Sequence, residues 1–409
     1  MNRVNVPKLR FPGFEGEWEE KKLQEVSSFL DGRRKPIKSG DRSKMKGEYP
    51  YYGASGIIDY VNNYIFDEEL ILLGEDGENI ISRNSPLAFR VSGKCWINNH
   101  AHVIVPKDNT NIDFLTHNLE RINYVVYNTG TAQPKLNQEV CRNIPSWFPS
   151  LPEQQKIASF LSAVDEKIQQ LSRKKELLEQ YKKGVMQQLF SGKLRFKDEN
   201  GNEYPDWEEK SFGDIFTFYT TNSLSREKLN YEEGKVKNIH YGDIHTKFKT
   251  LFDINNEIVP FINLDFDFSK IKKECYCQEG DLVIADASED YADIGKSIEI
   301  INLKNEKVLA GLHTFLARPN KTRMYIGFSG YIVRSDNFRK QIMTIAQGSK
   351  VLSISTGRLA MLEMKIPIIE EQQKIANFLS SIDAKIENTH GELEKIQLFK
   401  KGLLQKMFV

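Results

Sequence analysis

Apolar residues recur at heptad spacing in two long stretches, one in the middle of the chain and one at its end. The seven-residue spacing runs from Ile157 to Val185 in the first stretch and from Ile375 to Leu403 in the second. A heptad repeat is typical of a helix that presents a narrow apolar stripe to another helix. The pattern predicts two long helices, with these candidate spacer and partner-binding residues: Gln154, Gln155, Ile157, Phe160, Val164, Leu171, Leu178, Gln372, Gln373, Ile375, Phe378, Ile382, Ile396 and Leu403.

Further apolar residues in the same stretches, including Tyr181 and Phe399, are expected to widen the stripe. At 1.5 Å per residue each helix would be about 55–60 Å long, a length that suits a spacer. The alternative is two surface helices, each packed on its own domain.

The two helical stretches are copies of each other. Residues 153–191 and 371–409 align without a gap at an offset of 218, and 18 of the 39 positions are identical. The entry to each globular segment is repeated too, since Leu9-Arg-Phe11 returns as Leu194-Arg-Phe196. Joining the end of the chain to its start would recreate the middle junction, so the two termini are expected to lie close together.

The chain order of domain, helix, domain, helix sets the expected direction of the helices. The second helix must begin beside the domain in which the first one ends, so the pair should be antiparallel. We therefore expect an α+β protein of two mixed, mostly β domains separated by an antiparallel coiled coil of long helices, with an internal pseudo-two-fold. The expected boundaries are 1–150, 151–192, 193–367 and 368–409.

The globular segments alternate short apolar runs with turn residues, which favours strands. Runs such as Leu70 to Leu73 and Ile80-Ile81 lie in the first segment, and Asp76-Gly77 and Ser92-Gly93 have the composition of hairpin turns. Strands are also expected near 236–240, 282–285, 297–302 and 312–317, and helices near 112–122 and 336–346. The two segments share this rhythm but little sequence, which indicates one scaffold carrying two different binding surfaces.

Composition narrows the class of protein. The net charge is +1 over 409 residues, so any case for nucleic-acid binding must be local. Four cysteines are too few for a disulfide framework in a chain of this length. No apolar run reaches membrane-spanning length and the N-terminal residues do not resemble a signal peptide, so a cytoplasmic location is expected.

Catalytic and metal motifs are weak. Gly295-Lys-Ser297 matches the end of a phosphate-binding loop, but Asp290 stands where the first glycine is required. The amino-methyltransferase loop and a glycine-rich cofactor loop are missing as well. Cys95, His100 and His102 could ligate a metal, but no fourth ligand follows at zinc-site spacing. We expect neither catalytic residues nor a metal site.

The local case for DNA is better. Residues 30–48 contain seven basic and three acidic side chains, and the aromatic, glycine-rich turn at 50–56 follows them. Basic side chains fix a protein on phosphates, while polar side chains in loops contact base edges. A solvated charged loop is the alternative. The candidate DNA-binding residues are Arg33, Arg34, Lys44, Lys46, Tyr51, Tyr52, Ser55, Asn98, Asn99, His100, Thr129, Gln133, Lys135, His240, Tyr241, Asp243, His245, Asp286, Ser288, His313, Ser349, Lys350 and Ser353.

Three features together resemble one known family over essentially the whole chain. They are the duplicated Glu-Gln-Gln-Lys-Ile-Ala helices, the Pro-Tyr-Tyr-Gly-Ala-Ser-Gly turn at 50–56, and the Thr-Gly-Thr-Ala-Gln-Pro-Lys-Leu segment at 129–136. The chain resembles the DNA-specificity (S) subunits of type I restriction–modification systems.

The resemblance implies two target-recognition domains, each binding one half of a split, asymmetric DNA site, with the helices setting the gap. It also implies two methyltransferase (M) subunits that bind S-adenosylmethionine, and restriction (R) subunits that use ATP and Mg. The chain itself would be non-catalytic and hold no cofactor. Two alternatives stay open: a coiled-coil scaffold that spaces protein-binding domains, and a DNA methyltransferase or nuclease with fused recognition domains.

Overall fold

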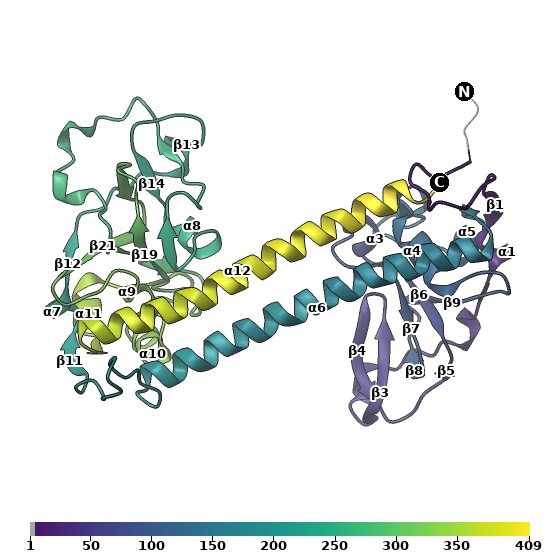
Figure 1. Cartoon of the computed structure of the whole chain (residues 1–409), viewed down its shortest axis with the longest axis horizontal. Helices are drawn as coiled ribbons and strands as arrows, with labels where there is room; N and C mark the ends of the chain where they lie inside the picture. Colours follow the sequence, from purple (N-terminus) through teal and green to yellow (C-terminus); the bar gives the residue numbers. More distant parts are fainter. Residues whose placement is uncertain (1–4) are drawn as a thin grey trace. The chain divides into compact units, whose positions relative to one another are not determined.

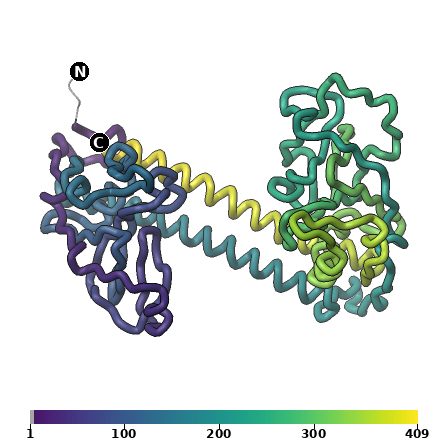
Figure 2. Tube along the Cα trace, turned by 180° about the vertical axis from the view of Figure 1, so that it is seen from behind, coloured from purple at the N-terminus to yellow at the C-terminus, as the bar shows by residue number. Residues whose placement is uncertain are grey.

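The computed structural model describes residues 5–409 (Figures 1 and 2). The chain divides into two compact units, residues 1–174 with 389–409, and residues 175–388. No helix in the described part of the chain is long and apolar enough to cross a membrane.

The first unit contains two four-stranded sheets and one strand pair. The core sheet lies against α4 and is flanked by short helices. The strand order of the core sheet is β2(Ser27–Phe29)-β9(Ala101–Pro106)-β6(Leu70–Gly74)-β7(Ala88–Val91). The strand order of the outer sheet is β4(Gly56–Val61)-β3(Lys46–Gly53)-β8(Lys94–Ile97)-β5(Phe66–Asp67). The strand pair is β1(Glu19–Lys22)-β10(Pro145–Phe148). The helices are α1(Leu23–Val26), η1(Asp31–Arg33), α2(Ser39–Arg42), α3(Asn79–Ser82), α4(Ile112–Arg121), η2(Tyr124–Tyr127) and α5(Gln138–Arg142).

The second unit repeats this plan with more strands. Its main sheet is β12(Phe216–Tyr219)-β21(Thr314–Pro319)-β17(Leu282–Ala285)-β19(Ser297–Asn302)-β15(Leu251–Asp253), and the others are β13(Leu229–Asn230)-β16(Phe261–Ile262)-β14(Lys237–Ile239)-β20(Val308–Ala310), β18(Ala287–Ser288)-β22(Leu352–Ser353) and β11(Glu208–Ser211)-β23(Glu363–Ile366). Its helices are α7(Phe212–Ile215), η3(Arg226–Lys228), α8(Tyr241–Thr246), η4(Phe268–Lys270), η5(Lys273–Cys275), α9(Ser329–Ile332), α10(Asp336–Ile345) and α11(Thr356–Ala360).

The two main sheets share one topology. In each sheet, a strand that follows a four-residue helix pairs with a late strand, and the late strand pairs with the buried central strand. The central strand pairs in turn with the next strand of the same sheet along the chain. The central strands, β6 and β17, are buried along their whole length. The prediction of two mixed, mostly β domains is confirmed.

The helices α6(Leu151–Phe190) and α12(Ile369–Lys406) belong to both units. In the first unit Ile157, near the start of α6, shares a core with Leu403, near the end of α12. In the second unit Val185, near the end of α6, shares a core with Ile375, near the start of α12. The pair is therefore antiparallel, as predicted. Both heptad ends also pack on the domain cores, so each helix contributes to the core of both units.

The apolar stripe is narrower than predicted. Tyr181 and Phe399 occupy equivalent positions of the two copies, and each side chain is 53% exposed. Leu171 is buried, whereas Leu178 and Ile396 are only half-buried. A two-helix contact covers few positions per turn, so residues at the edge of the stripe face solvent.

The junctions at the two ends of the duplicated unit match in detail. Leu9 donates its backbone N–H to Lys406 O at 2.8 Å, and Leu194 donates to Gln188 O at 3.1 Å. Gln188 and Lys406 are themselves 218 residues apart. The prediction about the termini concerns residues 1–4, which lie outside the described residues, but the segment from Leu9 onwards does lie against the end of α12.

Three local predictions are wrong. Ile80-Ile81 lies in the short helix α3 and not in a strand. Ser92-Gly93 connects β7 to β8, which belong to different sheets, and Asp76-Gly77 leads from β6 towards α3. Gly77 and Gly93 do have positive φ, as tight turns require. A turn bends the chain, but tertiary packing decides which strands then pair.

Candidate nucleic-acid interface

Polar residues of the first unit gather where the central strand β6 ends. Glu75 and Asp76 follow this strand, and the segment Asn98–His100 precedes its neighbour β9. The Glu75 backbone N–H donates to His100 O at 2.9 Å, and His100 Nδ1 lies 2.8 Å from Asp76 Oδ2. The predicted residue His100 is thus brought beside two acidic residues from another part of the sequence at one edge of the sheet.

The loop 129–135 joins this edge. Asp76 forms a backbone bridge with Lys135, and Lys135 Nζ lies 3.4 Å from Glu75 Oε1. Asn128 Oδ1 holds the loop closed by accepting the backbone N–H groups of Gly130 at 3.0 Å and Lys135 at 2.8 Å. Thr129 and Gln133 are exposed on it.

Only glycine fits at position 130 when the loop is closed in this way. A Cβ at position 130 would lie 1.8 Å from the carbonyl oxygen of Gln133, a distance that no side chain tolerates. The loop can therefore form only if the chain approaches itself at a glycine.

The loop is anchored to the core by His102. This side chain is fully buried, its Nδ1 lies 2.6 Å from Asp31 Oδ2 and its Nε2 lies 2.9 Å from Leu136 O. Burial lowers the pKa of His102, but hydrogen bonding to Asp31 and Cys141 outweighs it and raises the pKa to about 10. The protonated imidazolium donates a hydrogen bond from each ring nitrogen, so it links Leu136, at the end of the loop, to Asp31.

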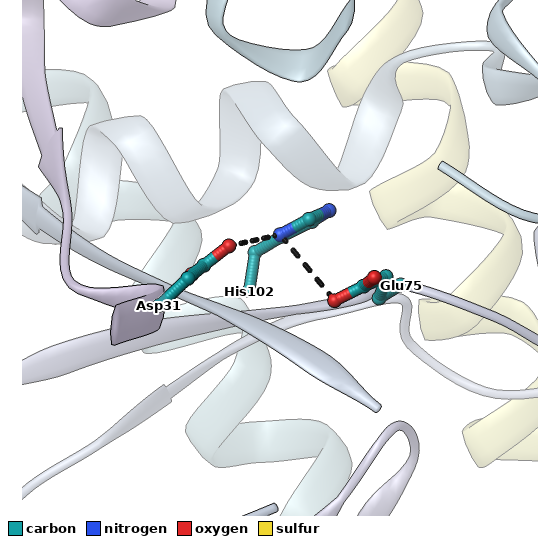
Figure 3. Close-up of side chains that lie close together, drawn as sticks. All are labelled: Asp31, Glu75 and His102. Atoms are coloured by element: carbon teal, nitrogen blue, oxygen red, sulfur yellow. Dashed lines mark hydrogen bonds and ion pairs between the residues drawn. The ribbon is translucent and has the colours of Figure 1, made fainter. Parts of the chain in front are cut away.

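Asp31, Glu75 and His102 form a group whose ligand atoms lie within 4.8 Å of one another, a geometry open to a metal ion (Figure 3). Arg34 already neutralises it, with Nη1 2.6 Å from Glu75 Oε2 and Nη2 3.4 Å from Asp31 Oδ2. Burial raises the pKa of Asp31, but His102 and Arg34 hold it below its usual value. The group therefore fits a structural ion network. Cys95, the third residue of the metal trio considered from sequence, belongs to a different apolar cluster.

The predicted basic residues divide into two sets. Arg33 pairs with Glu68 at 2.8 Å, Arg34 belongs to the ion network, and Lys46 pairs with Asp59 at 2.9 Å. Lys44 is exposed, and no acidic partner is found for it among residues 5–409. Lys44 is thus the best placed of the four to contact a phosphate.

The aromatic turn at 50–56 forms the β3–β4 hairpin (Figure 1). Tyr51 is buried, and its hydroxyl accepts the Ile37 N–H at 3.0 Å, so it supports the hairpin from inside. Tyr52 is half-buried and Ser55 is exposed at the tip. The backbone oxygen of Tyr52 accepts the Asn98 N–H at 3.1 Å, which places the hairpin beside the polar edge. Asn98 itself is buried, whereas Asn99 is exposed next to it.

The second unit builds an equivalent edge from different side chains. The Asp286 N–H donates to His313 O at 3.1 Å, as Glu75 does to His100, and His313 Nδ1 lies 3.2 Å from Asp286 Oδ1. The Tyr241 ring lies 4.7 Å from the His240 ring and 5.3 Å from that of His313. Burial, followed by the charge of Arg226, lowers the pKa of His240 to about 4, so this ring is neutral at pH 7.

Loop 347–353 is the counterpart of loop 129–135 at the same offset of 218. Gln347 and Ser353 exchange backbone hydrogen bonds at 2.9 and 2.7 Å, and Ser353 also pairs with Ala287. A Cβ on Gly348 would lie 2.0 Å from Val351 O, which repeats the constraint at Gly130. Ser349 and Lys350 are exposed on this loop.

Three other predicted residues of this unit have internal partners. Asp243 is fully buried and paired with Arg226 at 2.7 Å and Lys247 at 3.0 Å. Ser288 Oγ accepts the Asp290 N–H at 3.0 Å. His245 Nε2 lies 3.1 Å from Ala287 O. These contacts give the three residues a role in shaping the edge.

The predicted spacer and partner-binding residues of the two helices differ in how far they are buried. Gln154 and Gln372 are buried at equivalent positions of the two helices. The Gln154 side chain forms hydrogen bonds with the backbone of Asn109, Asn111 and Pro149. The Gln372 side chain forms the corresponding bonds with the backbone of Arg323, Tyr325 and Pro367. Gln155 and Gln373 are exposed, and Phe160 and Phe378 are half-buried. Only the exposed glutamines of this set remain available to a partner.

Sequence reasoning missed the acidic members of the site. Glu75 and Asp76 directly follow a buried strand, a position that could have been recognised. Asp31 carried no such signal, because its partner His102 lies 71 residues away.

Known proteins resemble this chain in sequence. The family described as type I restriction modification DNA specificity domain matches residues 15–180 and 204–398. A putative type I restriction enzyme specificity subunit of Haemophilus influenzae is 38% identical over 163 residues, 40% of each chain. The specificity subunit of the type I restriction enzyme MjaVIII of Methanocaldococcus jannaschii is 26% identical over 414 residues, 95% of this chain and 91% of that protein.

Solved structures share the fold. The S subunit of a type I restriction–modification system from M. genitalium has a TM-score of 0.63 at 15% identity, with 99% of both chains covered. The chain belongs to the type I restriction–modification DNA specificity family.

Proposed function

We propose that this chain is the sequence-specific DNA-binding subunit of a type I restriction–modification complex, and that each unit binds one half of a bipartite, asymmetric site. The observation that carries the proposal is the repeated edge. In both units a glycine-closed loop lies beside the end of the central strand, while the exposed side chains differ.

A conserved frame with different side chains suits two half-sites of different sequence. Asn98, His100 and Lys135 border the first edge, whereas Tyr241, His313 and Lys350 border the second. Amide, imidazole, ammonium and hydroxyl groups can contact base edges in the major groove. Lys44 would hold the register by contacting a phosphate.

The partners follow from the family. We infer two methyltransferase subunits, which would bring S-adenosylmethionine, and restriction subunits, which would bring ATP and Mg. The exposed faces of α6 and α12, including Gln155 and Gln373, are the candidate surface for the methyltransferase subunits. The chain itself would be non-catalytic.

Methylome mapping in a host that carries the chain and its partners tests the proposal. We expect one methylated sequence made of two unlike halves with a fixed gap. Exchange of residues 27–148 for those of another specificity subunit should change one half only, and a change in both halves would contradict the proposal. Because α6 and α12 contribute to both units, a four-residue insertion after Gly184 should lengthen the gap and leave both halves unchanged.

Two further assays address the alternatives. Gel shifts on random duplex DNA, with partner subunits present, distinguish a DNA-binding subunit from a protein scaffold. Binding of S-adenosylmethionine to the isolated chain would favour a methyltransferase.

A further inference from the structure

An exposed apolar side chain lies among the polar groups of the first edge. Ile58 on β4 is 52% exposed, although isoleucine is among the residues most often buried. A Cβ built on Gly53 would lie 3.3 Å from Ile58 Cγ2 and 3.5 Å from Asn98 Nδ2. Gly53 has no side chain, so the ends of Ile58 and Asn98 border the same space above its backbone.

The orientation of the Asn98 amide is fixed by its surroundings. The His100 backbone N–H can only donate, and it lies 2.8 Å from Asn98 Oδ1, so the amide oxygen must face it. The Asn98 N–H is held by Tyr52 O, which fixes the backbone at the same point. The Nδ2 group therefore points towards Gly53 and Ile58, and within residues 5–409 no acceptor is bonded to it. Asn98 as a whole is only 4% exposed, but Nδ2 is not among the unpartnered polar atoms that are closed off from solvent.

The result is a hydrogen-bond donor beside a branched apolar group. In the major groove only thymine presents an acceptor, O4, next to a methyl group on C5. Cytosine presents a donor at the corresponding position, and guanine presents acceptors without a methyl group. Adenine presents a donor and an acceptor, so it would need the Asn98 amide both to accept and to donate. Asn98 Oδ1, however, already accepts the His100 N–H.

We propose that Asn98 and Ile58 together recognise one thymine of the half-site bound by the first unit. Asn98 Nδ2 donates to O4, and Ile58 packs against the C5 methyl. This inference rests on the proposed function.

Deoxyuridine substitution tests it, because uracil lacks only the methyl group. The complex of the chain with its methyltransferase subunits is titrated with duplexes in which each thymine of this half-site is replaced singly. At one position the affinity should fall about fourfold, the value expected for one buried methyl group. Ile58→Ala should bind thymine and uracil equally at that position and remain sensitive to base changes elsewhere.

Two variants complete the design. Ile57→Ala removes the adjacent exposed isoleucine and should keep the fourfold difference, because the side-chain atoms nearest a Cβ at Gly53 belong to Ile58 and Asn98. Asn98→Asp keeps the acceptor for His100 but replaces the donor with an acceptor, so preference at the same position should move from thymine to cytosine.

The outcomes are separable. A half-site without thymine, a half-site with no position sensitive to uracil, or a sensitivity that persists in Ile58→Ala would overturn the thymine inference while leaving DNA specificity intact. Failure of the wild-type complex to bind any sequence preferentially would instead overturn the proposed function.

Discussion

Lys182 on α6 forms an ion pair with Asp383 on α12, with Nζ 2.5 Å from Oδ1. The same pair recurs with the helices exchanged, because Lys400 lies 2.5 Å from Asp165. Both lysines and both aspartates are 218 residues apart, so the duplication preserved the contact as well as the residues. In the second unit Tyr331 also donates its hydroxyl to Asp383 Oδ2 at 2.7 Å.

This pair should contribute measurably to the stability of the helix contact. Both side chains are partly shielded from water, so Lys182→Met should lower the free energy of unfolding by about 1 kcal/mol in urea titrations. Lys183→Met is the matched control, because the neighbouring lysine is exposed and should change stability by less than about 0.5 kcal/mol. Equal losses in the two variants would show that the ion pair contributes nothing.

His102 should make stability depend on pH in the alkaline range. Its pKa is raised to about 10 from an ordinary 6.5, so its contribution is complete below about pH 6.5 and is lost as pH rises through 10. His102→Gln should cost about 3 kcal/mol at pH 6, since it leaves Asp31 without its main partner. The difference from wild type should shrink as the pH approaches 10. Unfolding curves at several pH values measure it, with exposed His100→Gln as control, and parallel profiles for wild type and His102→Gln would contradict the prediction.

Gly130 should be needed for one half-site only. Gly130→Ala forces the loop 129–135 away from Gln133 O and should reduce affinity for the first half-site by tenfold or more, about 1.4 kcal/mol. Binding measured on duplexes with either half scrambled separates the two contributions. Gly40→Ala, where a Cβ meets nothing within 4 Å, is the control. Gly348→Ala should reverse the pattern, and loss of both halves in either variant would count against independent edges.

Lys44 should act on phosphate rather than on a base. Lys44→Ala should weaken binding to all sequences and reduce the slope of log K against log salt concentration by about 0.9. Lys46→Ala should have a smaller effect, because Lys46 already pairs with Asp59. Gel shifts over a series of salt concentrations measure both variants. A change confined to one base position would make Lys44 a base contact instead.

The sequence by itself determined the elements whose signal is local and repeated. Heptad spacing identified α6 and α12, because a helix places every seventh residue on one face. The alternating runs identified β6, β17, β19 and β21, and the repeated Leu-Arg-Phe triplet predicted matching junctions at Leu9 and Leu194. Even the family could be recognised from motifs that each span only six to eight residues.

Only the tertiary structure decided which side chains meet. Ser92-Gly93 has the composition of a hairpin turn, but packing sends its two strands to different sheets. His102 could have been a metal ligand until folding placed Asp31 and Arg34 beside it. The hydrogen-bonding direction of Asn98 depends on one backbone N–H of His100 and on a hairpin more than forty residues earlier. Periodicity is written into neighbouring residues, whereas the chemistry of a site depends on groups that come together only when the chain folds.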